Sequence, residues 1–81
     1  MTKSEINRRK KYLKGGYRQL EDMLRDANNG KTVLKASAIG AVLRGERTDN
    51  HGVFELFKAV TDAEKKRREK AAKEQAKKLA A

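Results

Sequence analysis

A stripe of apolar side chains with helical spacing is the feature that most restricts how this 81-residue chain can fold. Its members follow one another at steps of four and three residues: Leu13, Tyr17, Leu20, Leu24 and Ala27. Such steps place side chains on one face of an α-helix, so the stripe predicts an amphipathic helix. Gly15 and Gly16 predict a break near its start, and the Asn-Asn-Gly at residues 28–30 predicts its end.

A second apolar segment, residues 33–43, is nearly continuous and ends before Gly45, so we expect it at the centre of the core. Two starting points fit its helix. The helix can begin at Thr32, or a short extended piece can precede a helix that Ser37 caps, because Thr and Ser both make good caps.

A third apolar face at helical spacing lies in residues 53–60 and includes both phenylalanines of the chain. In the polar turn before it, the helix can be capped by Thr48, Asp49 or Asn50. The chain has no Pro and no alternating β-branched run, so we expect no sheet. We therefore predict an all-α protein, a small bundle of three to four helices.

The surplus positive charge sits at the two ends of the chain. The net charge is +10, of which residues 1–14 and residues 63–81 each contribute +5, whereas residues 15–62 are neutral. This distribution predicts a basic N-terminal arm (1–14), a helical core (15–61) and a basic helical tail (62–81). Glu–Lys and Glu–Arg pairs at i, i+4 favour one long C-terminal helix in the tail.

Such an imbalance of charge points to a polyanionic partner. We expect nucleic-acid binding, with DNA favoured over RNA, in which both basic ends contact the phosphate backbone. The candidate contacts in the arm are Arg8, Arg9, Lys10, Lys11 and Lys14. Those in the tail are Lys65, Lys66, Arg67, Arg68 and Lys70.

Charge is also unevenly distributed within the neutral core, because residues 28–47 carry a net charge of +3. The segment 37–47, Ser-Ala-Ile-Gly-Ala-Val-Leu-Arg-Gly-Glu-Arg, resembles the recognition helix and following turn of the lambda-repressor-like helix-turn-helix family. The apolar residues 53–60 are similar to the helix that packs behind it. Upstream the chain departs from the family pattern, with Val33 where the turn normally carries Gly and Asn29 where the preceding helix has a small residue.

The resemblance implies how the second helix would meet DNA. Its groove-facing residues would be Ala36, Ser37, Gly40, Ala41 and Arg44. Lys35 and Arg47 would lie on phosphates. A regulator of transcription is one role that fits.

We expect that the protein is not an enzyme and that it binds no cofactor or metal ion. The single histidine, His51, lies in a polar turn, and the chain has no Cys. Gly30-Lys31-Thr32 matches the end of a phosphate-binding loop, but Arg25 stands where that motif needs its first Gly.

No apolar run approaches the roughly 20 residues that span a bilayer, and the start lacks the apolar stretch of a signal peptide. The tail also lacks bulky apolar residues for insertion at a membrane surface. We therefore expect no membrane partner and a cytoplasmic location, associated with the nucleoid if the protein binds DNA.

Another class of function fits the same composition. A small helical interaction module, such as an inhibitor or adaptor encoded by a phage or plasmid, would bind an acidic surface of a larger protein. A homodimer formed through the 53–60 face or the Leu13–Ala27 stripe would add buried area to the thin core.

Overall fold

The first half of the C-terminal helix is the surface on which the rest of the chain packs. The computed structural model, which describes residues 1–80, contains four helices and no strand within that range. The helices are α1 (Lys3–Lys10), α2 (Arg18–Ala27), α3 (Ala36–Leu43) and α4 (Val53–Ala80). The predicted all-α fold with a long C-terminal helix is confirmed. Ala81, the last residue of the predicted tail, lies outside the described residues.

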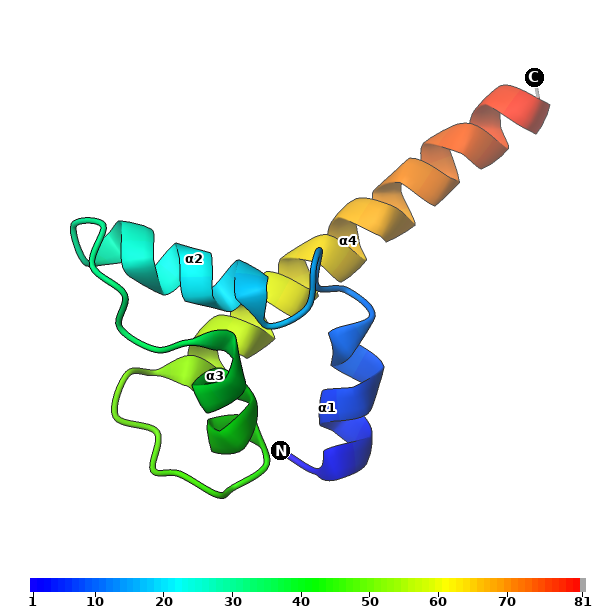
Figure 1. Ribbon diagram of the computed structural model, residues 1–81. Coiled ribbons are helices and arrows are strands. Elements are labelled where there is room, and N and C mark those ends of the chain that lie inside the picture. The colour runs from blue at the N-terminus through cyan, green and yellow to red at the C-terminus, as the bar shows by residue number, and fades with distance from the viewer. Residues whose placement is uncertain (81) are drawn as a thin grey trace.

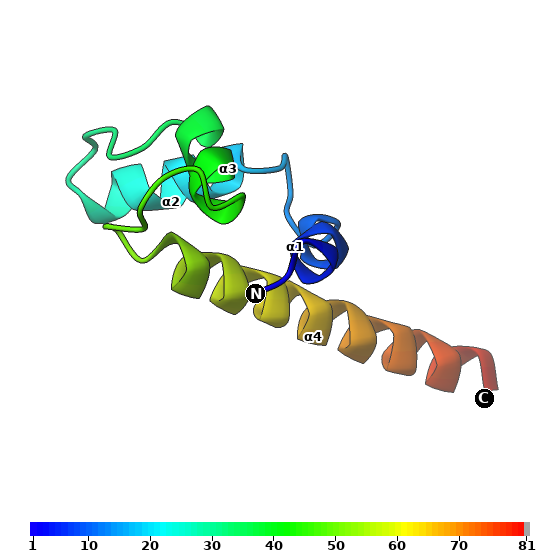
Figure 2. The same ribbon diagram turned by 90° about the horizontal axis from the view of Figure 1, so that it is seen from below.

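The molecule is elongated because only part of α4 has neighbours. Helices α1, α2 and α3 lie along the N-terminal half of α4, and its C-terminal half projects beyond them (Figure 1 and Figure 2). The principal extents of 50 × 31 × 17 Å reflect this projection. A single small core therefore lies at one end of a long helix.

Phe57 of α4 lies at the centre of the core and has no exposed surface. Leu20 of α2, and Ile39 and Val42 of α3, are buried with it. The Tyr17 ring meets Phe57 edge to face, with centroids 6.4 Å apart. Each large apolar side chain buried in this way contributes about 1.5–3 kcal/mol, so the three apolar segments hold the bundle together.

The two faces considered for a homodimer are occupied within the single chain. Leu20 of the Leu13–Ala27 stripe is fully buried, as are Val53 and Phe57 of the 53–60 face. These side chains pack against each other and against α3. These buried side chains are therefore not available to a second copy of the chain.

Residues 1–14 fold onto α4, where a solvated arm was expected. Helix α1 begins with Thr2 as its cap, whose hydroxyl accepts a hydrogen bond from the Glu5 amide (3.2 Å). Ile6 and Leu13 are buried in the core. These two apolar residues help to attach the segment, although cations surround them in the sequence.

The connections follow the predicted stop signals. Gly15 and Gly16 have φ values of 78° and 66°, which bulkier residues rarely adopt, and they separate α1 from α2. At the end of α3, the Glu46 amide donates to the Ala41 carbonyl (2.9 Å) and the Gly45 amide to the Val42 carbonyl (3.0 Å). This pair of hydrogen bonds is a Schellman motif with Gly45 in the left-handed conformation.

The start of α3 differs from both predicted possibilities. Lys35 occupies the cap position, and Ser37 is already inside the helix. The Ala36 amide instead donates to Glu21 Oε1 of α2, at 2.7 Å. A carboxylate from a neighbouring helix therefore takes the place of the expected serine cap, and it links α2 to α3.

Asp49 caps α4, as one of the three candidates in that turn. Its carboxylate accepts hydrogen bonds from the amides of Val53 (2.8 Å) and Phe54 (3.0 Å). Partial burial opposes ionisation, but hydrogen bonds from the backbone amides of Phe54, Val53, His51 and Gly52 outweigh it and lower the pKa of Asp49. The ionised carboxylate is thus the form that the fold stabilises.

Replacing Asp49 with Ala should lower the free energy of unfolding by about 1 kcal/mol at pH 7, as loss of a helix cap generally does. Because the folded state lowers the pKa of Asp49, this contribution is present above its unfolded pKa of about 3.9 and disappears as the pH falls through the folded value. Urea unfolding of Asp49→Ala beside Thr48→Ala, an exposed neighbour, measures the difference. A gap between Asp49→Ala and the parent that is as large at pH 2 as at pH 7 would contradict this role.

Candidate nucleic-acid interface

A hollow between α1 and α3 brings together cations that are far apart in the sequence. Its volume is about 220 Å³, and it is lined by Lys3, Ile6, Asn7, Lys10, Tyr17, Leu43 and Arg44. Ile6 and Leu43 are buried and form an apolar floor, whereas the three cations at the rim are exposed. Positive charge from the N-terminal segment and from the end of α3 therefore shares one surface.

Arg44 lines this hollow and folds back over its own helix. A Cβ atom on Gly40 would lie 3.1 Å from Arg44 Nη1 and 3.2 Å from the Tyr17 ring, so both side chains cover the glycine closely. Gly40 is buried, so it does not face outward as the family resemblance implied. Arg44 also pairs with Glu46 (Nη2–Oε2 2.9 Å), but side-chain exposures of 57% and 60% leave this pair screened by water and easily opened.

The outward face of α3 carries small side chains beside this arginine. Ser37, Ala41 and Arg44 follow at steps of four and three, which places them on one side of the helix. Lys35 before the helix and Arg47 after it are both exposed. We call the following set the α3–α1 surface: Lys3, Lys10, Lys35, Ser37, Arg44 and Arg47.

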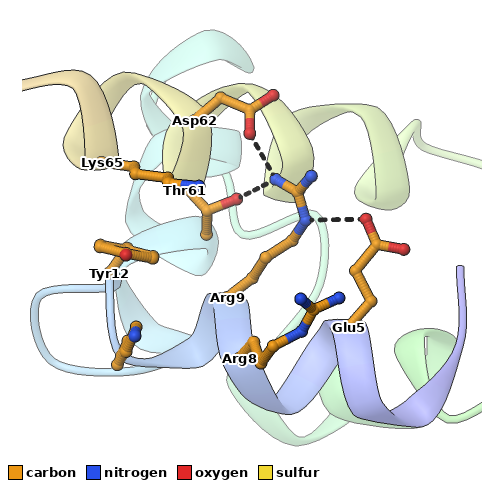
Figure 3. Close-up of a pocket in the computed structure, with 8 residues that line it drawn as sticks. Glu5, Arg8, Arg9, Tyr12, Thr61, Asp62 and Lys65 are labelled. Carbon is orange, nitrogen blue, oxygen red and sulfur yellow. Dashed lines mark hydrogen bonds and ion pairs between the residues drawn. The ribbon is translucent and has the colours of Figure 1, made fainter.

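Arg9 occupies a different position from its neighbours in the basic run. Its Nη1 donates to Asp62 Oδ1 (2.6 Å) and to Thr61 Oγ1 (3.0 Å), and its Nε donates to Glu5 Oε1 (3.2 Å), as Figure 3 shows. We call these four residues the Arg9 junction. The Asp62 hydrogen bond is the main cause that raises the pKa of Arg9, and the same bond lowers the pKa of Asp62. Arg9 therefore joins α1 to α4, and its charge is already balanced.

A second hollow, of about 230 Å³, lies beside the Arg9 junction between α1 and α4. Arg8, Lys11 and Lys65 line it together with Tyr12. The cations of the basic run 8–11 therefore lie on different sides of α1. Lys10 belongs to the α3–α1 surface, Arg8 and Lys11 face the α4 side, and Arg9 lies between them.

Two arginines of the tail form ion pairs within the chain. Glu64 accepts hydrogen bonds from Arg67 Nη2 (2.7 Å) and from Arg68 Nε (3.1 Å). The Arg67 bond, assisted by Arg68, outweighs partial burial and lowers the pKa of Glu64 to about 2. The Arg68 guanidinium also lies 5.1 Å from the centre of the Tyr12 ring, a cation–π contact. The other predicted contacts, Lys14, Lys66 and Lys70, are exposed.

Sequence reasoning missed part of this site. Lys3 and Asn7 join Lys10 at the hollow because they are spaced i, i+4 and i+7 along α1. That spacing is visible in the sequence, but it carries information only if residues 3–10 are taken as a helix. The acceptors of Arg9 on α4 are 52 and 53 residues away along the chain, and no local pattern predicts such a pair.

Comparison with known proteins gives no relative: no family model, no curated protein and no solved structure matches the chain. Among the described residues, no group of three His, Cys, Asp or Glu side chains is placed to hold a metal ion. Within the same range, no helix combines the length and the apolar character that crossing a membrane requires.

Replacing Arg9 with Ala should loosen α1 from α4, whereas replacing the exposed Arg8 should not. We expect Tm to fall by roughly 5 °C for Arg9→Ala, the scale of a moderate loss of stability in a domain of this size. Amide hydrogen exchange should accelerate in α1 in particular. Equal effects of Arg8→Ala and Arg9→Ala would show that the Arg9 junction does not hold the helix.

Proposed function

We propose that the protein binds double-stranded DNA through the α3–α1 surface, with α3 in the major groove. The observation that carries this proposal is the hollow between α1 and α3, where Lys3 and Lys10 lie with Arg44. Lys3 and Lys10 come from residues 1–14, with a net charge of +5, and Arg44 comes from residues 28–47, with a net charge of +3. Several cations around the outward face of one helix are the electrostatic pattern typical of DNA-binding domains.

The side chains of α3 suit close approach to DNA. Ser37 and Ala41 are small and face outward beside Arg44, so the helix can lie near base edges. Lys35 and Arg47 flank the helix, where they would contact phosphates. DNA is favoured over RNA because the major groove of B-form DNA admits an α-helix, whereas that of A-form RNA is deep and narrow.

The resemblance of residues 37–60 to lambda-repressor-like helix-turn-helix proteins supports the same assignment, with α3 as the recognition helix. A regulatory or accessory role on DNA would follow, in the cytoplasm and at the nucleoid.

An acidic protein partner is the second candidate. The apolar floor formed by Ile6, Tyr17 and Leu43 favours it, because such a floor could accept an apolar side chain between the cations. This partner would be recognised by a segment that carries both carboxylates and a bulky apolar residue.

Fluorescence anisotropy with a random-sequence 20-base-pair duplex tests the main proposal. Affinity should fall steeply with salt, and each of Lys35→Gln, Arg44→Gln and Arg47→Gln should reduce the slope of log K against log salt by roughly 0.9. Lys58→Gln is the matched control, since Lys58 is an exposed cation on α4. An affinity that ignores salt, or a Lys58→Gln effect equal to the others, would contradict the proposal.

A further inference from the structure

The projecting half of α4 carries a row of lysines on one face. Lys66, Lys70, Lys73 and Lys77 follow at steps of four, three and four residues. At about 100° per residue they fall within about 60° of one another, over a length of about 16 Å. Three of them, Lys70, Lys73 and Lys77, line one shallow depression on the helix together with Glu74 and Ala76. We call Lys66, Lys70, Lys73 and Lys77 the lysine stripe.

The lysine stripe points away from α3. The buried Phe57 marks the side of α4 that packs against α2 and α3. The centre of the stripe lies about 170° around the helix from Phe57. Figure 2 shows α2 and α3 on one side of α4 and no other element of the described chain on the opposite side. The α3–α1 surface and the lysine stripe therefore face different directions.

The charges of the stripe are available to a partner. Among the side chains described, every ion pair is made by an arginine, including the pairs of Arg67 and Arg68 with Glu64. All four lysines are exposed. Glu69 and Glu74 flank the stripe, but residues 65–79 contain eight basic and two acidic groups. The face is thus strongly positive, and its lysines form no ion pair within the described part of the chain.

We propose that the lysine stripe binds the phosphate backbone of a second DNA segment, so that one molecule bridges two duplexes. This inference rests on the proposed function of the α3–α1 surface. Regularly spaced lysine ammonium groups suit contact with duplex DNA, which carries one negative charge per about 1.7 Å of its axis. Such phosphate contacts do not depend on the base sequence. A membrane surface fits less well, because the exposed residues beside the stripe include no bulky apolar side chain that would insert.

Bridging is measured with one duplex fixed to beads and a second, labelled duplex in solution. The full chain should retain the label on the beads in dilute salt, and a large excess of protein should release it as each duplex becomes saturated. The double variant Lys70→Gln with Lys73→Gln should reduce label retention by about tenfold or more, since two phosphate contacts are lost. Its binding to a single duplex at limiting protein should change much less.

A matched control removes the same charge from other faces of α4. Lys58 and Lys78 are exposed and lie off the stripe, about 90° and 110° around the helix from its centre. The variant Lys58→Gln with Lys78→Gln should keep most of the bridging. Equal loss in both double variants would overturn the assignment to the stripe. Helix content by circular dichroism is compared for all chains.

Other outcomes separate this inference from the proposed function. Binding to one duplex without bridging overturns the second site and leaves the proposed function intact, whereas no duplex binding at all removes both. Bridging that survives in Lys70→Gln with Lys73→Gln, together with self-association in sedimentation, would assign bridging to a dimer and overturn the stripe. Phosphatidylserine vesicles that bind through the stripe, with no second duplex held, would also overturn it.

Discussion

The packing of three short helices against one half of α4 is the constraint on which the rest of the molecule depends. None of α1, α2 or α3 exceeds ten residues, and helices of that length are marginal in water by themselves. Phe57 lies in one buried cluster with Ile6 of α1, Leu20 of α2 and Ile39 of α3. The same packing places α1 beside α3. Cations from both segments therefore lie around the rim of one hollow. The grouping of cations at this surface is therefore a consequence of how the core packs.

Arginines and lysines have different electrostatic roles in the described part of the chain. Arginines make the ion pairs that hold or stiffen the described chain, most clearly at the Arg9 junction and around Glu64. The planar guanidinium can donate to several oxygens at once, which suits a junction with three acceptors. Lysines remain exposed at the surface and carry most of the unbalanced charge. A chain with a net charge of +10 repels itself, and internal arginine pairs offset part of that repulsion where the helices meet.

Local patterns predicted the elements well and their tertiary roles poorly. The Leu13–Ala27 stripe, the glycine break and the Asp49 cap are short-range features, and the structure confirms α2, its limits and the start of α4. Helix α1 was taken for an arm because its single apolar residue, Ile6, stands among cations and gives no stripe. Both predicted starts of α3, at Thr32 and after a Ser37 cap, were wrong, because Glu21 of another helix accepts the hydrogen bond from the amide of Ala36. Both errors have one cause: the deciding contact comes from elsewhere in the chain.

The most direct test of DNA binding at the α3–α1 surface is a titration of the ¹⁵N-labelled protein with a short duplex, followed by amide resonances. At one equivalent of duplex, we expect the largest shifts at Ser37 and Ala41 of α3, at Arg44 directly after it, and at Lys10 of α1. The amides of Leu20 and Phe57 in the core should move little. Shifts confined to α2, or an unchanged spectrum in dilute salt, would contradict the assignment of this surface to DNA.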